Sequence, residues 1–126
     1  MKYADHLARY RVADLSLDTF PYTSHTTASD SLWVGCPLVA LRGGTFAARV
    51  SASIVRNCNL PDLVTDSLEA YESLAFRLAT ERSYLDDVRA RVIASRDAAP
   101  LFDSRTFTRD LEKLYVDIAG TGGSGE

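Results

Sequence analysis

The sequence predicts an α/β fold in which a small, partial parallel sheet is followed by a helical C-terminal third. Three observations support this prediction. Short apolar segments at 13–18, 38–41 and 60–64 alternate with stretches of helical periodicity, a pattern typical of a parallel sheet with crossover helices. Residues 65–118 carry apolar side chains at helical spacing alone. A sheet of about three strands also looks incomplete, and we expect further strands upstream of Met1.

The chain begins with a predicted short amphipathic helix over residues 2–11. Residues 13–18 then alternate apolar and polar side chains and predict a strand, which Pro21 stops. A helix from Thr26 to Val34 is expected to end at Gly35, because Pro37 prevents its continuation. The predicted elements therefore open with helix, strand and helix.

The apolar run at 38–41 is typical of a buried strand, and Thr45 is expected to cap a helix that reaches Arg56. Residues 60–64 return as a loop and a minimal strand. The helix predicted from Thr45 to Arg56 has an apolar stripe, formed by Phe46, Val50, Ile54 and Val55.

Three helices follow. Residues 65–67 with Glu69 resemble a capping arrangement for a helix that ends near Ala79. Its stripe is Leu68, Tyr71, Leu74, Ala75 and Leu78, and that of the next helix is Tyr84, Leu85, Val88, Val92 and Ile93. The last helix, 104–118, is expected to point Phe107, Leu111, Leu114 and Tyr115 inward, and Trp33 is expected in the core.

Composition restricts the class of protein. The 126 residues suit one domain, predicted over 1–118, with a disordered Gly-rich tail at 119–126. A net charge of −3 argues against a nucleic-acid binder. No apolar run approaches the roughly 20 residues of a membrane span, and no secretory signal opens the chain, so we expect a cytoplasmic protein without membrane contact. Cys36 and Cys58 have neither disulfide nor metal-ligand spacing and are expected to be buried.

The segment 23–30 predicts an anion site at a helix start. Thr26 and Thr27 can cap the first turn, where backbone N–H groups without helical partners and the helix dipole favour a phosphate. The His25 ring lies beside them, and Asp30, one turn later, can reach a sugar hydroxyl. The pattern suits a nucleoside diphosphate. The alternative is an ordinary threonine cap beside an exposed loop histidine.

Several motifs together resemble one family. They are Asp5-His6-Leu7-Ala8-Arg9, Leu17-Asp18-Thr19, His25 to Trp33, Gly43 to Val50, Leu60-Pro61-Asp62-Leu63 and Ser95 to Tyr115. In this order and spacing they resemble the C-terminal catalytic half of the O-linked N-acetylglucosamine transferases, tetratricopeptide-containing protein glycosyltransferases of the GT-B type. The resemblance covers residues 3–118 and implies that the sheet is the Rossmann-like C-terminal half of a GT-B fold.

The resemblance also implies a UDP-sugar site without a metal or other cofactor. Matching motif to motif assigns His25, Thr26 and Thr27 to the diphosphate, Asp30 to the ribose, and His6 and Arg9 to the uracil. The alternative for His6 is a surface residue of its helix. The alternative for Arg49 is a side-chain stem that covers the helix face and pairs locally. The chain departs from the family at Tyr3, where some members have lysine, and at Arg42 and Gly44. No catalytic base is assigned, since Asp5, Asp14 and Asp18 read as caps or solvated partners.

The function that the resemblance implies is donor binding in a protein O-glycosyltransferase, which moves N-acetylglucosamine or another sugar from a UDP-sugar to serine or threonine of an acceptor protein. A GDP-sugar is a further candidate donor. Because the acceptor side and helical repeats would precede Met1, we expect the chain alone to be inactive and to self-associate through an open sheet edge. The alternative is a non-catalytic nucleotide-binding or protein-interaction module derived from the same fold.

Overall fold

A three-stranded parallel sheet forms the centre of the protein, whose computed structural model describes residues 2–121. The strands β1 (Ser16–Leu17), β2 (Leu38–Leu41) and β3 (Val64–Thr65) lie in the order β1-β2-β3. Ser16 pairs with Leu38, and Ala40 pairs with Val64. The predicted α/β class and parallel sheet are confirmed. Both edge strands are two residues long, and self-association through an edge stays a prediction.

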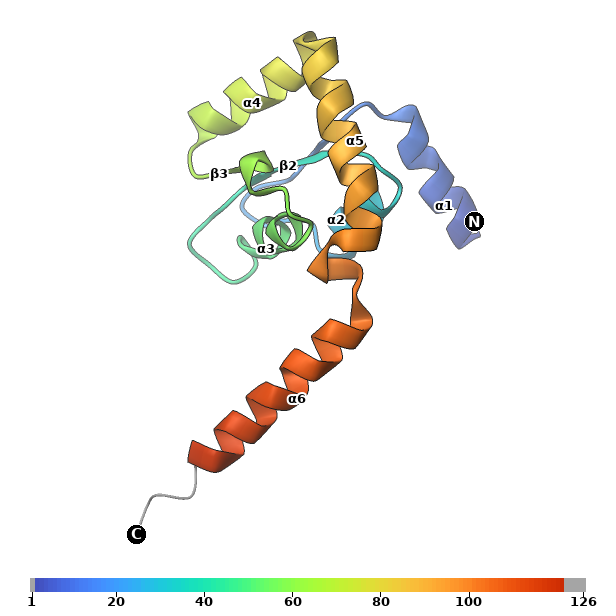
Figure 1. Ribbon diagram of the computed structural model, residues 1–126. Helices are drawn as coiled ribbons and strands as arrows, with labels where there is room; N and C mark the ends of the chain where they lie inside the picture. The colour runs from blue at the N-terminus through green and yellow to red at the C-terminus, as the bar shows by residue number, and fades with distance from the viewer. Residues whose placement is uncertain (1, 122–126) are drawn as a thin grey trace.

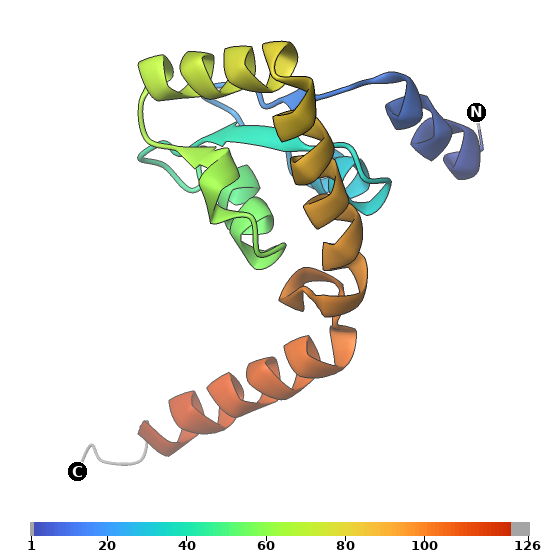
Figure 2. The ribbon, with the colours of Figure 1, turned by 45° about the horizontal axis from the view of Figure 1, so that its top comes forward.

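Six α-helices within residues 2–121 surround or extend this sheet (Figure 1). Their bounds are α1 Tyr3–Arg9, α2 Thr26–Trp33, α3 Val50–Asn57, α4 Leu68–Thr80, α5 Arg82–Ala98 and α6 Ser104–Thr121. Figure 2 shows α4 on one side of β2 and both α2 and α3 on the other, with α5 running down beside them. The sheet is therefore covered on both faces, which explains why β2 reads as a continuous apolar run.

The core is built around β2, whose four residues are at most 6% exposed. Helix α2 adds Leu32, α3 adds Val55, and α5 adds Val88 and Val92, each fully buried. Strand β2 and helices α2, α3, α4 and α5 thus share one core. Both cysteines are buried as predicted, and burial raises the pKa of the Cys58 thiol to about 11.

Two helix ends have the predicted chemistry. Gly35 follows α2 with φ of 88°, a left-handed conformation that glycine adopts at no steric cost. Ser67 begins α4 by accepting a hydrogen bond from the Ala70 N–H at 3.1 Å. Residues next to each boundary therefore account for these two helix ends: Gly35 by its backbone conformation and Ser67 by its side chain.

The helix predicted from Thr45 begins later than expected. Helix α3 starts at Val50, and Phe46 is 84% exposed rather than part of its buried stripe. The Thr45 hydroxyl caps a single turn by accepting from the Ala48 N–H at 3.3 Å. The Arg49 Nε donates to the Gly43 carbonyl at 3.0 Å, which is the local pairing that the sequence left open. Residues 43–49 therefore form a closed loop before the helix.

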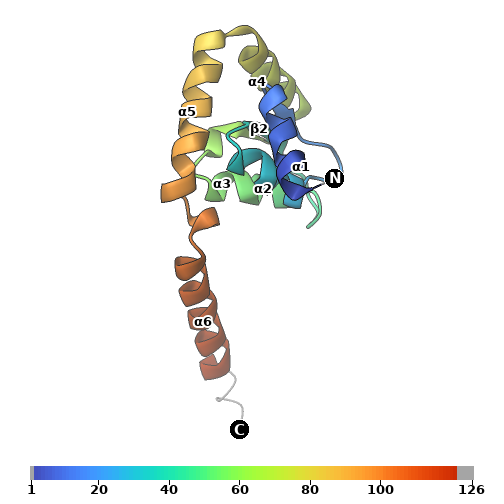
Figure 3. The same ribbon diagram turned by 90° about the vertical axis from the view of Figure 1, so that its right-hand side faces the viewer.

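Helix α6 extends away from the body of the protein (Figures 1 and 3), and its predicted inward face is wrong. Phe107, Leu111, Leu114 and Tyr115 are between 37% and 64% exposed. Apolar spacing identifies the face of a helix but not the surface that covers it. The helix also continues to Thr121, so residues 119–121 of the predicted tail are helical, while 122–126 lie outside the described residues.

Three other residues predicted to be buried are exposed. Trp33 is 47% exposed at the end of α2 and packs edge-on against Phe102, with ring centroids 5.1 Å apart. Leu68 and Ile93 are 60% and 51% exposed, because each lies at the margin of its helix stripe. The centres of the same stripes, Leu78 and Val88, are buried as predicted.

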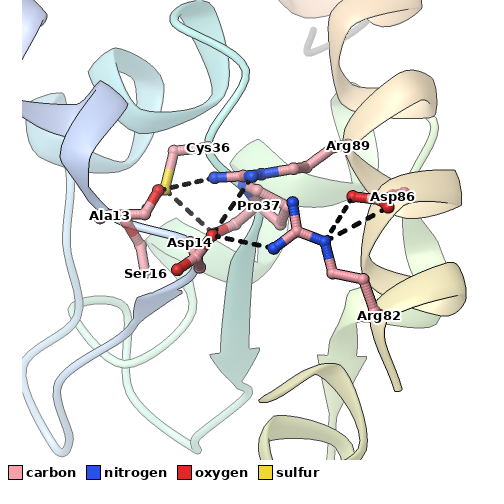
Figure 4. A network of polar contacts seen from close by, with 8 residues as sticks. All are labelled: Ala13, Asp14, Ser16, Cys36, Pro37, Arg82, Asp86 and Arg89. Carbon is pink, nitrogen blue, oxygen red and sulfur yellow. Dashed lines mark hydrogen bonds and ion pairs between the residues drawn. The ribbon is translucent and has the colours of Figure 1, made fainter. Parts of the chain in front are cut away.

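Ion pairs connect the chain before β1 to α5 (Figure 4). The Arg89 guanidinium donates to the Ala13 carbonyl at 2.8 Å and lies 3.3 Å from Asp14 Oδ1. Arg82 lies 3.8 Å from the same oxygen of Asp14 and also pairs with Asp86. Asp14 is thus the solvated partner that the sequence predicted, and exposed pairs of this kind contribute little to stability.

The loop after β2 has one glycine, Gly43, that no larger residue can replace unless the neighbouring backbone or Ala48 moves. A Cβ added at Gly43 would lie 2.5 Å from the Ala48 Cβ, whereas one at Gly44 would meet no atom within 4 Å. We expect Gly43→Ala to cost about 1–3 kcal/mol of unfolding free energy, because overpacking forces the loop apart. Gly44→Ala, the matched control, should leave stability within about 0.5 kcal/mol of the wild-type value.

Urea titration followed by circular dichroism measures both variants. Equal stability of Gly43→Ala and Gly44→Ala would contradict the close approach of Gly43 to Ala48.

Candidate functional site

Asp18 organises the loop that joins β1 to α2. Its side chain is 8% exposed, and its Oδ1 accepts the Ser24 N–H at 2.8 Å. Its Oδ2 accepts the hydroxyl of Ser51, which lies on α3 and is completely buried. The Asp18 carbonyl accepts the Tyr71 hydroxyl of α4 at 2.8 Å. Through its carboxylate and its backbone carbonyl, Asp18 therefore connects the loop after β1 to α3 and α4.

Thr23 fastens the same loop to the next one along the sheet. Both its N–H and its hydroxyl donate to the Ala47 carbonyl, at 3.2 and 2.6 Å. The Thr23 side chain is 1% exposed. The loops that follow β1 and β2 are thus held side by side at the carboxyl ends of their strands, where ligands bind in open α/β sheets.

The start of α2 leaves backbone donors available. The His25 carbonyl accepts the N–H groups of Ala28 and Ser29, at 3.1 and 3.3 Å. Within residues 2–121 the N–H groups of Thr26 and Thr27 have no hydrogen-bond partner, and both residues are exposed. Their hydroxyls do not cap the helix, contrary to the prediction, since His25 is the N-cap residue and Thr26 and Thr27 already lie in the first turn. The predicted anion-binding donors are nevertheless in place.

The His25 ring stacks on Tyr22, with centroids 5.2 Å apart and planes 18° from parallel. Its Nε2 is inaccessible to solvent and has no hydrogen-bond partner in the part of the chain that the structure describes. A buried ring nitrogen without a partner is costly, so a ligand group that pairs with it would be favoured. Tyr22 is 66% exposed and was not identified from the sequence.

His6 and Asp30, 24 positions apart, meet where α1 approaches α2. The His6 Nε2 lies 3.2 Å from Asp30 Oδ2, and the Tyr3 hydroxyl donates to Asp30 Oδ1 at 2.7 Å. Asp30 is 7% exposed. Arg9 is exposed on α1 and makes no ion pair within residues 2–121. The structure thus brings together His6 with Asp30, and separately His25 with Thr26 and Thr27.

The Asp30 carboxylate affects the two neighbouring tyrosines. Its hydrogen bond with Tyr3 raises the pKa of the Tyr3 hydroxyl, and burial and the negative charge of Asp30 add to this shift. Burial raises the pKa of Tyr10, with the same carboxylate as the second cause. Both phenols therefore remain protonated donors at neutral pH.

Sequence reasoning missed the structural roles of Tyr3, Asp18 and Tyr22. The position of Asp18 as the last residue of a predicted strand was a signal, but its partner Ser51 lies 33 residues away. An open cavity of about 580 Å³ lies nearby on α3, lined by Arg42, Phe46, Arg49, Val50, Ser53 and Arg56 among others. It includes none of the six predicted ligand-binding residues.

Across residues 2–121, no three histidine, cysteine or acidic side chains are grouped so that they could hold a metal ion. No helix in this described range has the length and apolar character needed to cross a membrane.

Comparisons with known proteins found a matching family, relatives in sequence and a similar solved structure. The model of the family described as glycosyl transferase family 41 matches residues 2–111. A Hordeum vulgare protein described as a probable UDP-N-acetylglucosamine–peptide N-acetylglucosaminyltransferase SPINDLY is 38% identical over 111 residues, which are 88% of this chain and 12% of that relative. The Caenorhabditis elegans UDP-N-acetylglucosamine–peptide N-acetylglucosaminyltransferase is 36% identical over 110 residues, or 87% of this chain and 10% of that protein.

Among solved structures, a mutant of the Thermobaculum terrenum O-GlcNAc transferase superposes with a TM-score of 0.85 and 34% sequence identity. The match covers 91% of this chain and 22% of that one. The chain therefore spans only a small part of the length of the relatives that it resembles.

Proposed function

We propose that this chain, which belongs to glycosyl transferase family 41, is the part of a protein O-glycosyltransferase that binds a UDP-sugar donor. The relatives named above are described as enzymes that use UDP-N-acetylglucosamine and act on peptides. We accordingly propose transfer of a sugar, N-acetylglucosamine in the first instance, to serine or threonine of an acceptor protein. The acceptor is held by parts of the enzyme beyond these residues.

The observation that carries this proposal is the start of α2. Two exposed N–H groups, at Thr26 and Thr27, lie beside a histidine whose Nε2 is buried without a partner in the described chain. Donors and the positive end of the helix dipole favour a diphosphate at this place. In a transfer reaction the same donors would stabilise the charge that develops on the departing UDP. No metal is needed for that role.

In this assignment His25, Thr26 and Thr27 bind the diphosphate, whereas His6 and Arg9 contact the uracil. The two groups of residues lie on different helices, α2 and α1. The hydrogen bonds that Asp30 accepts from Tyr3 and shares with His6 hold α1 against α2. We propose that one UDP molecule contacts both groups of residues. The ribose contact of Asp30 stays a prediction, from its place one turn after the helix start and from the family resemblance.

Replacing His25 tests the diphosphate assignment. We expect His25→Ala to weaken UDP binding by about 1.5–3 kcal/mol, the range for a hydrogen bond to a charged group, and to leave uridine binding nearly unchanged. His6→Ala is the matched control, since it removes the other histidine of the chain and should weaken UDP and uridine equally. Isothermal titration calorimetry of both variants with both ligands makes the comparison.

An equal loss of UDP and uridine affinity in His25→Ala would contradict the diphosphate assignment. If the wild-type chain binds neither ligand, the alternative of a protein-interaction module takes the place of this proposal.

A further inference from the structure

The open cavity of about 580 Å³ on α3 has no part in the proposed nucleotide site. It is lined by Val50, Ser53 and Asn57, which recur at helical spacing on α3. Phe46, from the loop before this helix, also lines it and is 84% exposed. Figure 1 shows α3 and this loop toward one side of the molecule and α1 on the other. The cavity is therefore a hollow with an exposed aromatic ring and apolar surface, separate from α1.

The charged residues of this cavity are all arginines. None of the described residues that line it is acidic. Arg42 is neutralised by Asp66, whose Oδ1 lies 2.7 Å from the Arg42 Nε. The Arg49 Nε donates to the Gly43 carbonyl, and its two terminal nitrogens have no partner within residues 2–121. The side chain of Arg56 makes no hydrogen bond or ion pair in this described range. Two exposed guanidinium groups thus keep unused donors.

The spacing of these two guanidinium groups restricts the ligand. Arg49 and Arg56 are two helical turns apart, so they lie on the same side of α3 and about 10 Å apart along its axis. Each guanidinium can donate two parallel hydrogen bonds to one carboxylate. In an extended peptide, which rises about 3.3 Å per residue, acidic side chains three positions apart have a matching separation. A peptide with two carboxylates therefore fits better than one small anion.

The rest of the chain favours a peptide over a larger polyanion. The net charge is −3, so long-range attraction to nucleic acid or to an anionic membrane is weak. Aromatic and arginine side chains together are typical of protein interfaces. Pockets that hold compact ligands have volumes of about 300–1,000 Å³, and this cavity falls in that range. It suits a few side chains of a partner rather than a folded domain.

We propose that the cavity on α3 binds an acidic peptide segment of a partner protein. Arg49 and Arg56 contact two carboxylates of this segment, and Phe46 covers an apolar side chain between them. Arg42 takes no part, because Asp66 already neutralises it. The inference goes beyond the proposed function, since it requires no nucleotide.

Fluorescence anisotropy with two labelled peptides tests the charge contacts. One peptide has two glutamates three positions apart with leucines between them, and the other has glutamines in their place. We expect the wild-type chain at low salt to bind the glutamate peptide at least tenfold more tightly than the glutamine peptide. Equal affinity for the two peptides, or no binding of either, would overturn the proposal.

Replacing Arg56 locates the binding. We expect Arg56→Gln to weaken binding of the glutamate peptide about tenfold, because a hydrogen bond between charged groups is lost. Arg109→Gln is the matched control, since it changes the net charge equally at an exposed residue of α6 that does not line this cavity. It should change the affinity less than twofold. Equal losses in the two variants would mean that net charge alone attracts the peptide, which overturns the proposal.

Replacing Phe46 tests the apolar contact. The exposure of Phe46 makes its replacement compatible with folding, which circular dichroism checks. We expect Phe46→Ala to weaken binding of the glutamate peptide about fivefold and Phe46→Leu to restore part of the loss. Wild-type affinity in Phe46→Ala would overturn the proposed orientation of the peptide in the cavity.

Competition separates this site from other ligands. We expect unlabelled glutamate peptide to displace the labelled one, and UDP, single-stranded RNA and phosphatidylserine vesicles to leave it bound. Displacement by UDP would join the cavity to the nucleotide site, and displacement by RNA or vesicles would assign it to that class of polyanion. Each of these displacements would overturn the proposal, whereas a chain that binds the peptide but no UDP would overturn only the proposed function.

Discussion

Replacing Asp18 with alanine is expected to lower the free energy of unfolding by on the order of 3 kcal/mol, because a buried hydroxyl and a partly buried N–H lose their acceptor. The Ser24 N–H and the hydroxyl of Ser51 both donate to this carboxylate, and Ser51 is completely inaccessible to solvent. The measurement is equilibrium unfolding in urea, with the midpoint and slope determined together.

Asp14→Ala is the matched control. Asp14 lies four residues earlier, has a 68% exposed side chain and pairs with the exposed or half-exposed arginines of α5. Its loss should cost less than about 1 kcal/mol, as measured for surface ion pairs. If Asp14→Ala destabilised the protein as much as Asp18→Ala, the central place given to Asp18 in the loop before α2 would be wrong.

Leu32→Ala should destabilise the protein by about 2–5 kcal/mol, since it leaves a cavity where α2 packs on the core. Leu32 is completely buried and lies on the helix that carries Thr26, Thr27 and Asp30. Thermal unfolding with calorimetry measures the loss. UDP affinity should fall as well, in proportion to the fraction of chains that remain folded at the temperature of the measurement.

The same substitution on α6 provides the control. Leu114 is 58% exposed, so Leu114→Ala should change the unfolding free energy by no more than about 0.5 kcal/mol. A large effect at Leu114, absent at low protein concentration, would mean that the apolar face of α6 is covered in solution by another chain.

Local sequence chemistry predicted much of the fold. The apolar run at 38–41 identified the central strand, because a strand covered on both faces needs no polar positions. The start of α2 at Thr26 and its end before Gly35 followed from residues within a few positions of each boundary. For the same reason the anion-binding donors of the candidate site were predictable, since a helix start has unpaired N–H groups whatever the rest of the protein does.

Other features depend on contacts between distant segments, and no local pattern encodes them. Asp18 meets Ser51 across 33 positions, and Asp30 meets His6 across 24, so these two carboxylates connect segments that are distant in the sequence. Conversely, the apolar stripe of α6 was correctly read as a helix face but wrongly as a buried one. Periodicity follows from the geometry of a single helix, whereas burial and side-chain pairing require a second surface, and the chain specifies that surface only when it has folded.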